Sequence, residues 1–129
     1  MGVRLSPWGS YGDVGVSNPL SLFTYAIQEL STRGIAYLHL IEPRATAEQL
    51  WLNTAGIPES AATLFRQAFK GPLIAAGGFG RESAAAAIEK GQDDAVAFGR
   101  DFISNPDLPL RLMFGAKLNS VTVLNEGVH

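Results

Sequence analysis

The sequence contains no cysteine, only two histidines and little net charge, and each shortage excludes a class of protein or site. Without cysteine the chain has no disulfide framework and no thiolate metal site. A formal net charge of −2 over 129 residues gives no electrostatic basis for binding nucleic acid or an anionic membrane surface. No apolar run reaches the roughly 18 residues of a membrane span. We therefore expect a cytoplasmic protein with no nucleic-acid or membrane partner.

A metal centre is not expected either. The two histidines, His39 and His129, are too far apart in sequence to provide the ligand spacing of a metal site. What the sequence does contain is apolar material, since 47% of its residues are hydrophobic. That fraction is enough for a packed core in a single domain.

Four short apolar runs alternate with stretches of helical periodicity. The expected strands are residues 2–5, 36–41, 73–76 and 95–98. The first expected helix begins at Pro19, and the next three cover about residues 59–70, 82–90 and 108–114. A glycine closes each of these helices, as is common at helix C-termini.

This alternation predicts an α/β fold of parallel strands with right-handed crossovers. The strands are apolar on both faces, which is typical of buried parallel strands. About four βα units are half of a (β/α)8 TIM barrel, so we expect half of such a barrel. A small open flavodoxin-like sheet is the alternative.

Two strand ends combine glycine with a following helix start. Gly77 and Gly78 precede Phe79 after one run, and Gly99 precedes Arg100 after the next. Glycine lets backbone N–H groups approach phosphate oxygens, and arginine adds a forked charge. The last two strands of TIM barrels frequently carry such a site. The pattern predicts a phosphate site of a cofactor enzyme; the alternative is that these glycines only make tight turns.

Other residues also have both a functional and a structural interpretation. Arg4 lies in an apolar run, where a guanidinium requires an anion or a hydrogen-bond network. It is either a partner for an anionic cofactor or half of a structural ion pair. His39 and Glu42, near the end of the second strand, could be an acid/base pair, but regular alternation places them on opposite faces. A hydrogen-bonded core histidine is the favoured interpretation. Aromatic residues of the expected loops could cover a planar ligand or simply pack: Trp8, Tyr11, Trp51 and Phe79.

Five segments carry a family resemblance. They are residues 3–7 (VRLSP), 37–44 (YLHLIEPR), 69–79 (FKGPLIAAGGF), 98–100 (FGR) and 104–108 (SNPDL). In this order and spacing they resemble the Old Yellow Enzyme family of FMN-dependent ene-reductases, from the fifth to the eighth barrel strand. The resemblance covers residues 1–119, taken as the C-terminal half of an FMN-binding barrel, and leaves 120–129 as a divergent tail.

The resemblance implies a cofactor, a reaction and site residues. Family members pass hydride from NAD(P)H to FMN and then to an activated alkene such as an enone, enal or nitroalkene. Arg4 would face the flavin ring near N1. The FMN phosphate would be held by backbone groups of Gly77, Gly78 and Phe79, completed by Gly99 and Arg100, and Phe79 would also flank the ring.

The family's catalytic groups are not implied for this chain. Its proton-donating tyrosine and substrate-binding pair lie on early strands for which no segment here matches, and His39 is not one of them. We therefore expect no catalytic residue in this chain. A half barrel leaves edge strands and an apolar face, so we expect self-association or a complementary half barrel as partner. A cofactor-binding fragment or split subunit is the alternative function.

Overall fold

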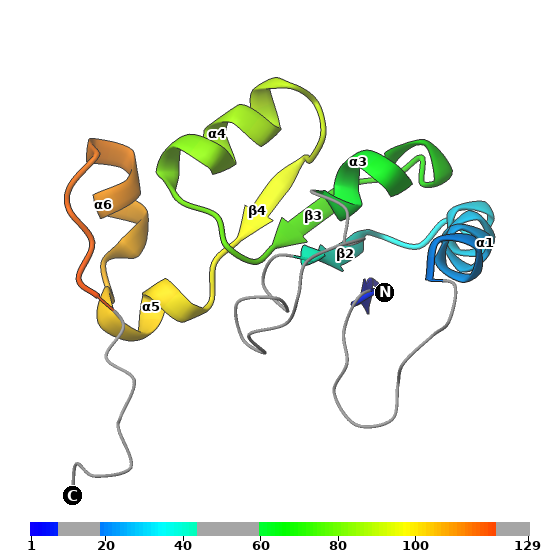
Figure 1. The fold of residues 1–129 in the computed structure, drawn as a ribbon, viewed down its shortest axis with the longest axis horizontal. Helices are drawn as coiled ribbons and strands as arrows, with labels where there is room; N and C mark the ends of the chain where they lie inside the picture. The colour runs from blue at the N-terminus through cyan, green and yellow to red at the C-terminus, as the bar shows by residue number, and fades with distance from the viewer. Residues whose placement is uncertain (8–18, 44–59, 121–129) are drawn as a thin grey trace, which may run out of the picture. The chain divides into compact units, whose positions relative to one another are not determined.

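Four short parallel strands form one sheet in which each strand pairs with the next along the chain. The computed structural model describes residues 1–7, 19–43 and 60–120 (Figure 1). The sheet order is β1-β2-β3-β4, for β1 (Val3–Leu5), β2 (Leu38–Ile41), β3 (Leu73–Ala76) and β4 (Ala95–Ala97). All pairings are parallel, so the prediction of consecutive βα units is confirmed.

The chain divides into two compact units, Met1–Ala97 and Phe98–His129. The first unit contains the sheet, α1 (Pro19–Thr32), α3 (Ala61–Phe65), the 3₁₀ helix η1 (Arg66–Ala68) and α4 (Arg81–Glu89). The second holds α5 (Arg100–Ser104) and α6 (Leu108–Phe114). Gly115, at φ 68°, ends α6 in the left-handed conformation expected of a C-terminal glycine.

The core of the first unit lies on one face of the sheet. Alternating residues of β2 and β3 are fully buried there, namely Leu38, Leu40, Leu73 and Ala75. Ile27 of α1 and Phe65 of α3 belong to the same buried cluster, so these helices cover that face. The strands alternate because successive side chains point to opposite faces.

The other face of the sheet is only partly buried. Its residues include His39 and Ile41 on β2 and Ile74 on β3, all half-buried, whereas Arg4 and Ala95 are exposed. The expectation that both faces are buried is therefore wrong for the described part of the chain. The described helices cover one face only, and we refer to the second face, which none of them covers, as the open face.

The second predicted helix differs from the structure. Residues 59–70 were expected to be helical, but α3 tightens into η1 and ends at Ala68, and Phe69 is extended at φ −121°. Leu64 is 42% exposed, while Phe65 and Phe69 are buried. A 3₁₀ turn holds three residues rather than 3.6, so it rotates the chain and lets Phe69 reach the core from extended backbone.

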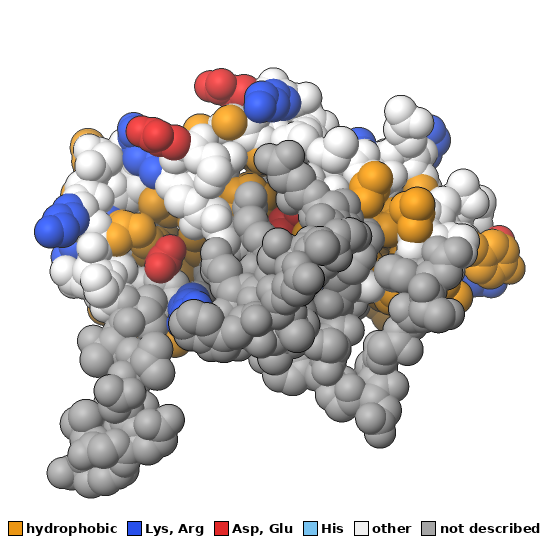
Figure 2. Space-filling model, viewed as in Figure 1, with side chains coloured by type: hydrophobic (Ala, Val, Ile, Leu, Met, Phe, Trp, Pro, Cys, Tyr) orange, Lys and Arg blue, Asp and Glu red, His pale blue; other side chains and the backbone are white. Residues whose placement is uncertain are grey.

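Apolar side chains also reach the surface in both units (Figure 2). In α5 and α6 they include Ile103, Met113 and Phe114, each at least 67% exposed. Within the described ranges, no helix has the length and apolar character to cross a membrane. The same part of the chain contains no cluster of three or more His, Asp or Glu side chains arranged to hold a metal ion.

Candidate functional site

Gly77 and Gly78 directly follow β3 and precede α4. Their φ angles are 113° and 69°, a region that residues with a Cβ rarely adopt. Backbone conformation therefore requires glycine here, as the tight-turn interpretation predicts. The same turn leads through Gly80, the N-cap, into α4. Because helix N-termini present unpaired N–H groups, this is also a place where an anion can bind.

Gly99 and Arg100 directly follow Phe98, the first residue of the second unit. Gly99 is the N-cap of α5 at φ −114°, and Arg100 is the exposed first residue of that helix. No described atom lies within 4 Å of the position that a Cβ would take at Gly99. Neither the φ angle nor the packing of the described residues demands a glycine at this position. Close approach of a ligand to the backbone would explain a glycine at position 99.

Arg4 is exposed on the open face of the sheet, so the expectation of a guanidinium inside a buried strand is wrong. β1 is an edge strand, and no described helix covers the face on which Arg4 lies. None of the ion pairs among the described residues includes Arg4. Its structural interpretation as half of an ion pair therefore has no support in that part of the chain.

His39 is the register partner of Arg4 on β2, so both side chains belong to the open face. Its Nε2 atom is buried and has no hydrogen-bond partner. The expectation of a hydrogen-bonded core histidine is thus wrong for this nitrogen. Burial lowers the pKa of His39, and the nearby Arg4 guanidinium lowers it further. Both effects favour the neutral imidazole.

Glu42 does not form an acid/base pair with His39. Its carboxylate is almost completely buried and binds the first turn of α3, where Ala61 N donates to Oε2 at 2.8 Å and Ala62 N donates to Oε1 at 3.3 Å. The Ser60 hydroxyl lies 3.4 Å from Oε1. A carboxylate at a helix N-terminus satisfies free N–H groups and complements the helix dipole. Glu42 is therefore a capping residue.

Phe79 belongs to the segment between β3 and α4. It lines a cleft of about 570 Å³ together with residues of α3 and α4, among them Leu64, Ser83 and Ala86. The other expected aromatic residues, Trp8, Tyr11 and Trp51, lie outside the described residues, as do residues 121–129 of the divergent tail.

Arg4 and the glycine turn are separated along and across the sheet. Arg4 aligns through His39 with Ile74, and Gly77 comes three residues later on the chain of β3. With strands about 4.8 Å apart and a rise of about 3.3 Å per residue, the Cα atoms of Arg4 and Gly77 lie on the order of 14 Å apart. One elongated ligand, with a polar ring at one end and a phosphate at the other, suits that spacing.

Sequence reasoning missed two polar anchors. Asp94 Oδ2 accepts hydrogen bonds from Leu73 N and from Arg66 Nη1, both at 2.9 Å, which fixes the start of β3. The hydrogen bond from Leu73 lowers the pKa of Asp94 first, and the one from Arg66 lowers it further. The partners lie 21 and 28 residues away, so no local motif reveals them.

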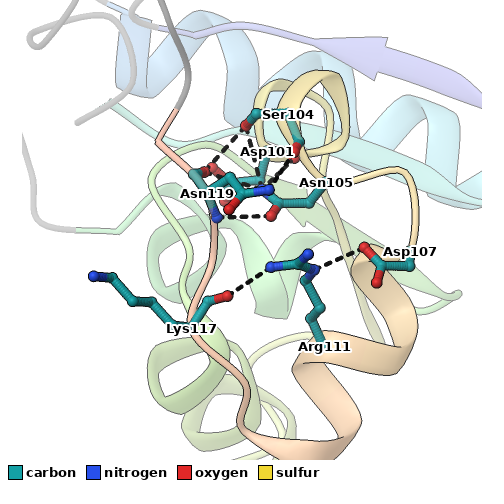
Figure 3. A network of polar contacts seen from close by, with 7 residues as sticks. All are labelled: Asp101, Ser104, Asn105, Asp107, Arg111, Lys117 and Asn119. Atoms are coloured by element: carbon teal, nitrogen blue, oxygen red, sulfur yellow. Dashed lines mark hydrogen bonds and ion pairs between the residues drawn. The ribbon is translucent and has the colours of Figure 1, made fainter.

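The second anchor is Asn105, fully buried between α5 and α6 (Figure 3). Its Nδ2 donates to Asp101 O at 2.9 Å and to Asn119 O at 3.1 Å, and its Oδ1 accepts from Asn119 N at 2.7 Å. Arg111 adds contacts to Asp107 and to the carbonyl of Lys117. The sequence SNPDL marks a chain break, but only the fold shows that Asn105 ties Asn119 to the end of α5.

The chain is similar to proteins of one flavoenzyme family. A profile described as the NADH:flavin oxidoreductase / NADH oxidase family matches residues 1–119. 12-Oxophytodienoate reductase 2 of Arabidopsis thaliana is 45% identical over 92% of this chain, and a 12-oxophytodienoate reductase-like protein of Solanum lycopersicum is 42% identical over 92%. The chain spans about 30% of the length of these curated relatives.

Solved structures give the same result. Morphinone reductase matches 92% of this chain at 38% identity with a TM-score of 0.75, and the chain covers 30% of that protein. The old yellow enzyme homologue from Zymomonas mobilis matches 95% at 35% identity with a TM-score of 0.81, with 33% of its own length covered. The four βα units thus form part of a TIM barrel, and the chain spans about a third of the length of these proteins. The chain belongs to the NADH:flavin oxidoreductase / NADH oxidase family.

Proposed function

We propose that this chain is the FMN-binding part of an NAD(P)H-dependent flavin oxidoreductase that reduces activated alkenes such as enones, enals and nitroalkenes. Relatives in the family are named reductases, and one solved relative is a morphinone reductase in complex with tetrahydroNAD. The proposed setting is cytoplasmic. The proposed barrel part is residues 1–119, with 120–129 as a tail.

The observation that carries this proposal is the glycine turn at the carboxyl end of β3, on the same sheet as Arg4. We propose that the backbone of Gly77, Gly78 and Phe79 in this turn holds the phosphate of FMN, and that Gly99 and Arg100 complete the phosphate site. Gly99 fits this role because no described atom occupies the space of its missing Cβ.

The ring end of FMN fits the open face. Arg4 is an exposed cation there without an ion-pair partner among the described residues, and the buried Nε2 of His39 next to it lacks a hydrogen bond. A guanidinium suits the polar edge of a flavin ring, where negative charge develops on reduction. When bound, FMN would supply the hydride-transfer chemistry, taking hydride from NAD(P)H and passing it to the alkene.

The chain's own residues would bind and tune the cofactor. Arg100 and the turn amides would hold the phosphate, and Arg4 would stabilise the reduced ring by its charge. We assign no catalytic residue, because the proton donor and the substrate-binding pair belong to segments of the family that nothing here matches.

The second candidate is a cofactor-binding fragment or split subunit that acts with a complementary half barrel or a second copy of itself. The open face and the two sheet edges, β1 and β4, favour it. Parallel sheets are almost always covered on both faces, and open edges pair readily with other strands.

Titration of the purified chain with FMN tests the proposal, followed by flavin fluorescence and the visible absorption band. Saturable binding with quenching is expected, and Arg4→Ala should make the bound flavin harder to reduce. No binding to folded protein would contradict the proposed FMN site, and an unchanged reduction potential would contradict the role of Arg4. Light scattering of the same samples separates the two candidates: a clean monomer that binds FMN would exclude self-association.

A further inference from the structure

One row of side chains crosses the open face of the sheet. Arg4 on β1, His39 on β2, Ile74 on β3 and Ala95 on β4 are register partners in turn. Neighbouring strands lie about 4.8 Å apart, so Arg4 and His39 are adjacent. These two are the polar residues of the row, and the other two are apolar.

The two polar residues are complementary: His39 has a hydrogen-bond acceptor without a partner, and Arg4 has donors. Nε2 of His39 is buried and unpaired, although buried polar atoms are nearly always hydrogen-bonded. Arg4 has five N–H donors on a long stem and takes part in no ion pair among the described residues. A neutral imidazole with its proton on Nδ1 offers a lone pair on Nε2, and a guanidinium can donate to it.

We propose that His39 is a positioning residue for Arg4: a change of rotamer of the exposed Arg4 side chain brings the guanidinium to Nε2, and the neutral imidazole accepts its hydrogen bond and holds that group on the open face where the flavin ring would lie. The expected effect on FMN binding rests on the proposed function. The contact between Arg4 and His39 rests on their pairing in the sheet. Holding a flexible arginine in place removes part of the entropy loss that binding would otherwise require.

Protonation of His39 would end this arrangement. An imidazolium has no lone pair to offer and carries a charge of the same sign as Arg4. No other described group on this face offsets the pair: Ile41, Ile74 and Ala95 are apolar, and the nearest carboxylate along the chain, Glu42, is bound to α3. The lowered pKa of His39 favours the neutral, accepting form.

The first test uses the chain without FMN. Nitrogen-15 NMR of the imidazole gives the tautomer and the titration of His39 in the wild type and in Arg4→Ala. We expect the Nδ1–H tautomer in the wild type and a higher pKa of His39 in Arg4→Ala. Arg33→Ala, which removes another exposed arginine of the same unit, should leave the titration unchanged. A His39 titration that is identical in the wild type and Arg4→Ala would overturn the proposal.

The second test measures the FMN dissociation constant against pH. His39→Gln keeps an acceptor that does not titrate, whereas His39→Leu removes the acceptor. The wild type should lose about tenfold more affinity than His39→Gln on acidification, the value of one hydrogen bond to a charged group. Because the FMN phosphate itself titrates near pH 6, only this difference counts. His39→Leu should bind about tenfold more weakly even at neutral pH.

The Arg4→Ala background separates positioning from a general structural effect. There, His39→Leu should cause no further loss of FMN affinity, and an equal loss in both backgrounds would overturn the proposal. If no variant and no wild-type sample binds FMN, the proposed function fails, and the NMR titration alone still decides whether His39 holds Arg4.

Discussion

Ala61 donates its backbone N–H to Oε2 of Glu42 at 2.8 Å, which ties the carboxyl end of β2 to the first turn of α3. Glu42 is 1% exposed, so loss of this bond would leave a buried amide without its acceptor. The pair shows that the acidic residue nearest to His39 in the sequence serves the fold. It also gives the first testable consequence.

Glu42→Gln should lower the free energy of unfolding by about 2 kcal/mol, because it weakens buried charge-assisted bonds to the α3 amides. Urea denaturation followed by circular dichroism measures the change. Glu82→Gln, in the exposed first turn of α4, is the matched control and should shift stability by less than about 0.5 kcal/mol. Equal losses in the two variants would show that Glu42 does not cap α3.

The glycines of the proposed phosphate site should separate into two classes. Gly78→Ala places a Cβ on a residue at φ 69° and should destabilise the fold by about 1–2 kcal/mol. Gly99→Ala meets no described atom within 4 Å, so the loss should stay below about 1 kcal/mol, the value of a poorer N-cap. FMN affinity should nevertheless fall in Gly99→Ala. Thermal unfolding and FMN titration of both variants check this, and unchanged FMN binding in Gly99→Ala would remove Gly99 from the site.

Arg100→Ala should weaken FMN binding by about tenfold to a hundredfold, the value of one or more hydrogen bonds between a guanidinium and a phosphate. Riboflavin lacks the phosphate, so its affinity should not change. Arg33→Ala serves as the control for loss of an exposed arginine and should leave both affinities intact. An equal loss for FMN and riboflavin would place Arg100 away from the phosphate.

Acid should remove the contribution of Asp94 to stability. The hydrogen bonds from Leu73 and Arg66 lower the pKa of Asp94 in the folded state, so the folded state binds its proton less readily than the unfolded chain. The stabilisation is therefore present above the ordinary aspartate pKa of about 3.9 and is lost as the pH falls through the lower folded value. Asp94→Asn should show a shallower decline of stability in this range, measured by urea midpoints. A decline as steep as that of the wild type would contradict the assignment.

Asn105→Ala should release the segment that follows α6. Asn105 provides both donor and acceptor to the backbone of Asn119, and each lost buried hydrogen bond costs about 1–3 kcal/mol. Hydrogen exchange at the Asn119 amide should therefore accelerate strongly. Asn119→Ala is the matched comparison, since it keeps those backbone bonds and loses only the side-chain bond to Ser104 O. Equal exchange rates in the two variants would argue against the Asn105 clamp.

The order of the elements was predictable because it depends on local signals. Apolar runs and closing glycines located all four strands and most helix ends, and Pro19 marked the start of α1. The burial of Arg4 was predicted wrongly because its neighbours in sequence are apolar, whereas exposure depends on which elements cover the face. Phe69 was placed in a helix because periodicity does not show where a helix tightens into a 3₁₀ turn.

The candidate site was predictable only where glycine residues directly follow a predicted strand. Gly77, Gly78 and Gly99 could be selected because they follow strands, and the family resemblance supplied their proposed roles. The cap of Glu42 on α3 spans 19 residues, and its partners are backbone amides of Ala61 and Ala62, which any residue type provides. The unpaired Nε2 of His39 likewise depends on packing and on the register of β1 against β2. Such properties have no signature in the order of residues.

The agreement between strand order and chain order makes the sheet modular. Each pairing, β1 with β2, β2 with β3 and β3 with β4, joins neighbours separated by a single crossover. No pairing among the described strands skips a strand. Truncation after a complete βα unit would therefore remove the strands and helices that follow and leave the pairings of the earlier strands intact.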